Sequence, residues 1–192
     1  MLFNDNTLKT NIFGWPSNAF KDLPLQDLKY YKYKRAMKNI PEVVHPLIEK
    51  MLCVYEDMGL VWDDKSNPEG YTLLIDYKIR DVKAGKCTCG LEGWHIDVVR
   101  NPNHNEDTDY HLIYTTEVGT EFLLNKIAIE KSDTTFNDAL KRFADSQEAP
   151  EIHQALPDTV SLFKRLQLHR GAVVEKDHRR MLVRLTLTKV IK

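Results

Sequence analysis

The chain has 192 residues, of which 42% are hydrophobic and 29% are charged, the composition of an ordinary soluble protein. Its formal net charge of −1 excludes the strongly basic character of a dedicated nucleic-acid-binding protein, so we expect no nucleic-acid partner, although a local basic patch is compatible with this charge. The N-terminus lacks the basic stretch and apolar core of a signal peptide, and no apolar run is long enough to span a membrane. We therefore expect a cytoplasmic protein with no membrane partner.

The first 60 residues are predicted to form a helical and irregular cover over the rest of the chain. Residues 26–37 fit a short helix, but their run of tyrosines also suits a strand. Residues 41–58 are predicted to form an amphipathic helix, with Pro41 in its first turn and Gly59 at its end. Its apolar residues recur at helical spacing: Val43, Val44, Leu47, Ile48, Met51, Leu52 and Tyr55. We expect this helix to cover one face of a sheet.

From residue 60 onward the pattern becomes typical of β-structure, with aromatic and β-branched residues between polar turns. The predicted strands are 71–79, 93–99, 110–116, 119–124, 159–163, 166–169 and 181–190. One helix interrupts them, with Ser132 as its N-cap and apolar residues through Phe143. Several short strands separated by polar turns favour a sandwich or barrel over βαβ units. We expect a single domain over 1–192, with the N-terminal cover at 1–60 and the β core at 61–192.

The candidate site begins with Trp94-His95-Ile96-Asp97, followed 74 residues after its histidine by His169. Residues i and i+2 of a strand point to the same face, so His95 and Asp97 can reach one ion together. A distant histidine on a neighbouring strand completes a set of two imidazoles and one carboxylate. Such a set typifies non-haem Fe(II) oxygenases and leaves coordination positions open for substrate and oxygen.

A His-x-Asp triplet is weak evidence on its own, because it occurs by chance on many solvated strands. The residues around His169 strengthen the hypothesis, since this histidine lies in an apolar run. Arg180 and Arg184 follow it by eleven and fifteen residues on a strand-like run and share one face. An arginine can bind a carboxylate with two hydrogen bonds, although a solvated edge strand explains the same pattern. Arg179 lies on the opposite face and is the weaker candidate.

These motifs together resemble the Fe(II)/2-oxoglutarate-dependent dioxygenase superfamily. The resemblance extends over about residues 70–190, from the His-x-Asp strand through the run ending in Gly119-Thr120-Glu121-Phe122 to Leu168-His169-Arg170-Gly171 and Arg179-Arg180-Met181-Leu182. Within that superfamily, the chain is similar to an uncharacterised branch. Many members carry a Gly-Gly pair where this chain has Val118-Gly119-Thr120, which is a departure from the pattern.

The resemblance implies a double-stranded β-helix (jelly roll, cupin-like) and an oxygenase that uses dioxygen, with hydroxylation the expected reaction. It assigns Fe(II) to His95, Asp97 and His169, with 2-oxoglutarate as cosubstrate. Arg180 would bind the distal carboxylate of 2-oxoglutarate, with Arg184 as the alternative. Tyr114 and Thr116 are candidates for a hydrogen bond to the cosubstrate. His111, on the opposite face of the same strand, stays open as the alternative candidate, because only one of these faces can point inward. The substrate remains unnamed.

Two rival interpretations stay open. One is a non-catalytic jelly-roll module that binds a ligand or partner, and the other is a cupin-type metalloenzyme that needs no 2-oxoglutarate. A zinc site at Cys87-Thr88-Cys89 is disfavoured, because structural zinc sites use wider cysteine spacing and a second ligand pair. The polar loop 100–109 fits either a substrate lid or a solvated hairpin loop.

Overall fold

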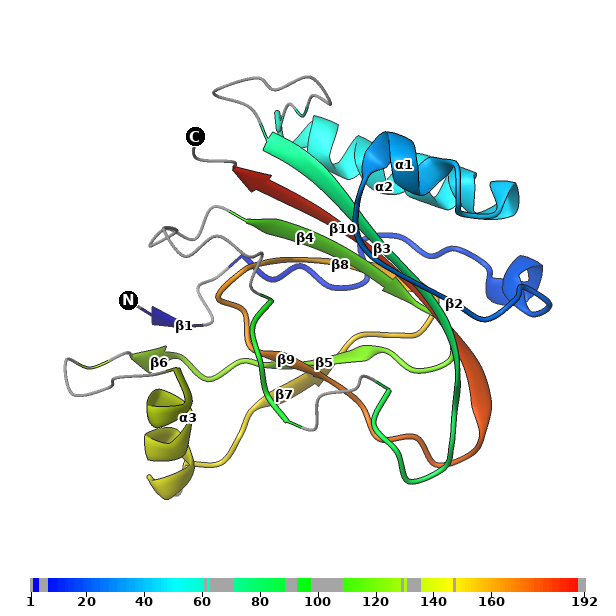
Figure 1. The fold of residues 1–192 in the computed structure, drawn as a ribbon. Coiled ribbons are helices and arrows are strands. Elements are labelled where there is room, and N and C mark those ends of the chain that lie inside the picture. Colours follow the sequence, from blue (N-terminus) through cyan, green and yellow to red (C-terminus); the bar gives the residue numbers. More distant parts are fainter. Residues whose placement is uncertain are drawn as a thin grey trace.

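The computed structural model describes residues 2–3, 7–60, 62, 71–88, 93–97, 109–128, 130, 136–146 and 148–189. The fold is mainly β with few helices, as predicted (Figure 1). Its helices are η1 (Ser17–Phe20), α1 (Tyr33–Met37), η2 (Glu42–Val44), α2 (His45–Asp57) and α3 (Phe136–Asp145). Its strands are β1 (Leu2–Phe3), β2 (Gln26–Lys32), β3 (Tyr71–Val82), β4 (Tyr110–Thr115), β5 (Thr120–Leu123), β6 (Ile127–Ala128), β7 (Ile152–Gln154), β8 (Thr159–Lys164), β9 (His169–Gly171) and β10 (His178–Lys189). Among the described residues, no helix combines the length and apolar character needed to cross a membrane.

Two antiparallel sheets form most of the structure. The larger has the strand order β2-β3-β10-β4-β8 and the smaller has the order β7-β5-β9, while β1 pairs with β6. Figure 1 shows α1 and α2 on one side of the larger sheet and the smaller sheet on its other side. In the larger sheet, β10 is central, and its Arg184 lies opposite Asp76 of β3 and Ile113 of β4. Residues from distant parts of the chain therefore become direct neighbours across β10.

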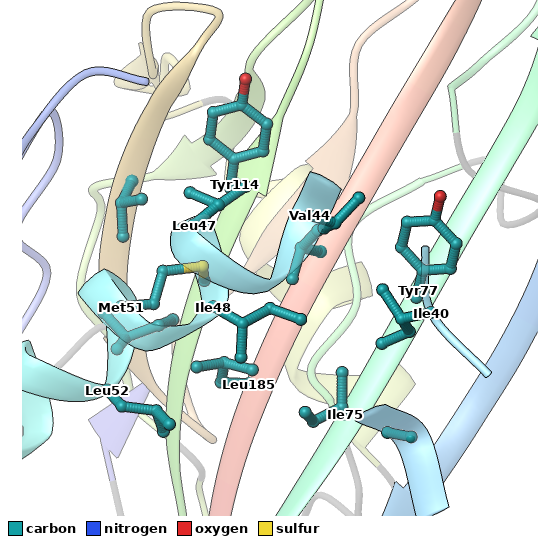
Figure 2. Packing of buried hydrophobic residues seen from close by; sticks show 14 of the residues in the cluster. Ile40, Val44, Leu47, Ile48, Met51, Leu52, Ile75, Tyr77, Tyr114 and Leu185 are labelled. Carbon is teal, nitrogen blue, oxygen red and sulfur yellow. The ribbon is translucent and has the colours of Figure 1, made fainter. Parts of the chain in front are cut away.

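Side chains of the larger sheet alternate between two different environments. On the face toward α2, the strands present Ile75, Tyr77, Val183 and Leu185, all of which are fully buried. The helix α2 and the preceding turn η2 contribute apolar side chains to the same core, which Figure 2 shows: Val44 of η2 and Leu47, Ile48, Met51 and Leu52 of α2. The opposite face of the sheet carries many polar side chains. The period of two along a strand thus separates an apolar core from a polar interior.

The helix predicted over residues 41–58 is confirmed, as a short 3-10 turn that continues into α2. Pro41 caps the 3-10 turn, and Pro46 stands in the first turn of α2, where a missing N–H costs no hydrogen bond. The helix ends where Gly59 adopts a φ of 69°, a conformation that glycine takes without a steric penalty. Its N–H donates to the carbonyl of Glu56 over 2.8 Å.

Some predicted elements differ from those observed. Both alternatives for residues 26–37 occur, since β2 is followed directly by α1. The strand expected at 166–169 begins only at His169, because the chain turns at Arg165 and Leu166, where the N–H of Gln167 bonds the carbonyl of Lys164 over 3.0 Å. Residues 98–99 of the strand expected at 93–99 lie outside the described residues, as does Ser132.

We predict that Met51→Ala lowers the free energy of unfolding by about 2–5 kcal/mol, because it leaves a cavity between α2 and the sheet. Met51 is fully buried, whereas Met58 at the end of the same helix is 37% exposed. Met58→Ala is therefore the matched control and should change the free energy of unfolding by no more than about 0.5 kcal/mol. Urea unfolding followed by circular dichroism measures both, and equal losses would contradict this packing.

Candidate metal centre

The backbone brings His95 and His169 together. Each of these residues donates its N–H to the carbonyl oxygen of the other, and both hydrogen bonds measure 3.0 Å. Two residues that exchange both bonds form a directly opposed antiparallel pair, so their side chains leave the sheet on the same face. The two imidazole rings have centroids 4.5 Å apart. The segment containing His95 therefore lies beside β9, at the edge of the smaller sheet.

Alternation along residues 94–97 turns the two polar side chains inward. Trp94 and Ile96 pack with the apolar cluster that includes Ala139 and Leu140 of α3. The side chains of His95 and Asp97 point to the opposite face of this segment and approach His169. The expectation that these residues share a face is confirmed by this placement.

The two histidines and the aspartate form a cluster that can hold a metal ion. Their candidate donor atoms all lie within 4.8 Å of one another. Asp97 and His169 are buried and His95 is partly buried, and a carboxylate oxygen of Asp97 lies 3.3 Å from Nε2 of His169. One carboxylate and two imidazoles are a donor set suited to Fe(II), Zn²⁺ and related transition metals.

Main-chain carbonyls fix the orientation of both imidazole rings. Nδ1 of His95 lies 3.1 Å from the carbonyl of Gly93, and Nδ1 of His169 lies 3.0 Å from the carbonyl of Gln167. A carbonyl can only accept a hydrogen bond, so Nδ1 is the protonated nitrogen in each ring. In the neutral form of each ring the lone pair then resides on Nε2, which is the usual arrangement when a second contact orients a metal-binding histidine.

Charges around the cluster favour its metal-binding protonation state. Burial acts to raise the pKa of Asp97, but Arg184 and His169 outweigh that effect and hold the pKa well below its usual value. Burial and the neighbouring His169 lower the pKa of His95. Asp97 is therefore ionised and His95 neutral near pH 7. Both forms are those that a metal ion requires.

A cavity of about 380 Å³ opens beside the cluster, within the size range of small-molecule sites. Both predicted arginines line it. Arg184 forms ion pairs with Asp76 and Asp97. Arg180 is buried and donates to the carbonyls of Val118 and Thr88 over 3.4 Å each. The structure thus places both arginines at the cavity, with Arg184 bound to two carboxylates.

The structure does not bring Tyr114 and Thr116 to the cluster, and this expectation needs correction. The hydroxyl of Tyr114 donates to the carbonyl of Trp15 over 3.0 Å, and its ring packs in the core beneath α2. The hydroxyl of Thr116 accepts the N–H of Met181 over 2.9 Å. The pairing of β4 with β10 turns the other face of β4 toward the cluster.

Asp76 was missed at the sequence level, whereas His111 was kept there as the alternative on the opposite face of its strand. Asp76 interrupts the apolar run of β3 and is 1% exposed, which makes it the buried counter-charge of Arg184. His111 is fully buried, stacks on Phe163 and lies 3.0 Å from the hydroxyl of Thr186. A polar residue inside an otherwise apolar strand is the signal that could have identified each of them.

The thiol of Cys87 lies 2.9 Å from the carbonyl of Gly171, near the cavity wall rather than in the donor cluster. Cys89 lies outside the described residues, as does the loop 100–109 except for Asp109.

No protein-family model matches this chain, and no curated protein sequence matches it significantly.

We predict that the chain binds a divalent transition metal and that His169→Ala weakens this binding by at least about tenfold, because one of three donors is lost. Titration with Co²⁺, followed by its visible absorption, measures the affinity. His153→Ala removes an imidazole that contacts Thr10 and lies outside the cluster, so it should leave the affinity unchanged. Equal affinities of both variants for Co²⁺ would refute the metal centre.

We further predict that His111 makes the fold acid-sensitive. Burial lowers the pKa of His111 from 6.5 to about 3, so the unfolded chain binds a proton between these values while the folded chain does not. Stability should therefore fall as the pH drops. From pH 7 to pH 5, the wild type should lose about 2 kcal/mol more than His111→Gln does. Urea unfolding at both pH values checks this, and parallel losses would contradict it.

Proposed function

We propose that this protein is an Fe(II)- and 2-oxoglutarate-dependent oxygenase that acts as a hydroxylase. The observation that carries the proposal is the cluster of His95, Asp97 and His169 at the wall of a cavity that also contains buried arginine. Two imidazoles and one carboxylate on one face leave coordination positions open for a bidentate 2-oxo acid and dioxygen. A bound iron with its cosubstrate would supply the activation of dioxygen.

We also propose that the fold is a double-stranded β-helix. The chain alternates between the two sheets, because β3, β4, β8 and β10 belong to the larger sheet while β5, β7 and β9 belong to the smaller one. The segment at His95 joins the smaller sheet through its bridge to His169. Two facing antiparallel sheets with long crossings between them are the pattern of a jelly roll. This order places both halves of the candidate centre on neighbouring segments.

The protein's own residues would take distinct roles. His95, Asp97 and His169 would hold the metal, with both rings oriented by main-chain carbonyls. Arg180 would bind the distal carboxylate of 2-oxoglutarate, because it is buried in the cavity wall and belongs to the same face of β10 as Arg184. Arg184 would orient Asp97, since its guanidinium already contacts two carboxylates.

We predict that the wild type binds 2-oxoglutarate when Fe(II) is present and turns it over in air, releasing succinate. Arg180→Ala should raise the dissociation constant of 2-oxoglutarate by at least about thirtyfold, since truncating one partner of a buried charged pair costs about 2 kcal/mol or more. Isothermal titration under nitrogen measures binding, and succinate formation measures turnover.

Arg179→Ala is the matched control for this experiment. Arg179 is the sequence neighbour of Arg180, but it points to the other face of β10 and pairs with Asp81 at the surface. It should therefore bind 2-oxoglutarate like the wild type. A wild-type chain that binds metal but neither binds nor consumes 2-oxoglutarate would refute the oxygenase and favour a metalloenzyme of another class.

A further inference from the structure

The described part of the cavity wall carries more positive than negative charge. Six basic side chains line it: Lys29, Lys78, Arg80, Arg170, Arg180 and Arg184. Four carboxylates lie among them or pair with them, namely Asp97, Asp76, Asp27 and Glu121. Arg80, Arg170 and Arg184 contact these four carboxylates, whereas Lys29 and Lys78 carry two positive charges that form no ion pair among the described residues. The charges of a divalent metal and of dianionic 2-oxoglutarate would cancel each other and leave the two lysine charges unchanged.

Two lysines account for the unbalanced charge. Among the described residues, neither Lys29 nor Lys78 forms an ion pair, although both lie close enough to Asp27 to lower its pKa. Lys78 belongs to β3, and the Lys29 side chain reaches the same cavity from β2. Lys78 is partly buried, and this burial lowers the pKa of its ammonium group. An anion placed between these two lysines would therefore relieve an unfavourable concentration of positive charge.

An irregularity in β2 sets an aromatic ring at the same cavity, with the guanidinium of Arg184 5.6 Å from the centre of the ring. The register of β2 against β3 shifts between Leu28 and Tyr31, and Tyr30 within this interval has a φ of 54°. Such a conformation is uncommon for a bulky residue and is often found at functional sites. The N–H of Tyr30 donates to Asp76 over 2.7 Å, and its ring lies at the cavity, 39% exposed. The strand thus offers a planar apolar surface next to a cationic one.

We propose that the substrate carries a phosphate monoester, which binds at Lys29 and Lys78 with the adjoining part of the molecule against Tyr30. This proposal deepens the proposed function and rests on it. A phosphate monoester carries a charge of about −1.5 to −2 at pH 7, which matches the two positive charges of these lysines. The ammonium group of lysine binds phosphate as a point charge, whereas the planar guanidinium group of arginine is suited to bind a carboxylate through two parallel hydrogen bonds.

The experiment measures binding of phenyl phosphate to the full chain by isothermal titration, with benzoate as the carboxylate comparison. Two double variants are compared with the wild type. Lys29→Gln with Lys78→Gln removes the cavity lysines, and Lys32→Gln with Lys38→Gln removes two exposed lysines that do not line the cavity. Each titration is run on the metal-free chain and, under nitrogen, with Fe(II) and 2-oxoglutarate present.

We expect phenyl phosphate to bind the wild type more tightly than benzoate does, with and without the metal and cosubstrate. The cavity variant should lose at least about tenfold in affinity, because each lysine contributes a charge-assisted hydrogen bond, and the surface variant should lose none. Absent binding, equal binding by the cavity variant, or benzoate binding as tight as that of phenyl phosphate would each overturn the proposal.

Because the metal-free titration needs no iron, its outcome is separate from that of the oxygenase test. Lysine-dependent phosphate binding without any use of 2-oxoglutarate would refute the oxygenase and retain the anion site. A short oligothymidylate distinguishes the source of the phosphate. Its backbone phosphates are diesters. If it binds through the same lysines more tightly than phenyl phosphate, the site recognises a nucleic acid and the phosphate monoester proposal is overturned. If it binds more weakly, the phosphate monoester of a small molecule is supported.

Discussion

The polar interior of this protein depends on neutralising one buried guanidinium. Arg184 stands on the central strand of the larger sheet, with its side chain only 11% exposed. Moving such a charge out of water costs several kcal/mol unless it is paired and hydrogen-bonded. Asp76 supplies one partner from the neighbouring strand, and Asp97 supplies the other from a segment outside the named strands. The position of Asp97 is therefore set by the central sheet as well as by its own short segment.

This arrangement has opposing effects on metal binding. Arg184 keeps Asp97 ionised and oriented, which removes the cost of deprotonating and ordering that ligand. The same guanidinium repels a dication nearby, because like charges in a region of low dielectric interact strongly. Asp76 reduces that repulsion by balancing part of the charge of Arg184. The candidate centre is thus preorganised in geometry, while its affinity for a dication would be moderated.

Local patterns in the sequence were sufficient for the helix at 41–58 and for most strands of the core. They also indicated the three donors, because His95 and Asp97 share parity and His169 precedes the strand that carries the arginines. Local patterns could not decide which face of residues 110–116 points inward. Both faces of β4 are apolar enough for a core, and the choice depends on its register with β10, where Thr186 lies opposite His111. That pairing joins residues 75 positions apart and leaves no local signature.

The same limit explains why the partner of Arg184 was not anticipated. Arg184 had the right face and spacing to bind the carboxylate of a ligand. Only the register of β10 with β3 shows that its guanidinium group already pairs with a carboxylate of the protein, that of Asp76. Asp76 alone could have been marked as a buried charge in an apolar run, since such residues require a partner. The identity of that partner is a property of the sheet and could not be obtained from either strand alone.

Asp76 also connects the candidate metal centre to the outer cavity. One of its oxygens accepts the N–H of Tyr30, and the other contacts Arg184, which in turn contacts Asp97. A metal ion at the candidate centre would compete with Arg184 for Asp97 and would leave more of the guanidinium charge to be balanced by Asp76. Asp76 stabilises the uncommon backbone conformation of Tyr30 through this hydrogen bond. The same carboxylate balances the charge of Arg184, which in turn orients Asp97. Occupancy of the candidate centre and the shape of the cavity beside Tyr30 would consequently be linked through one carboxylate.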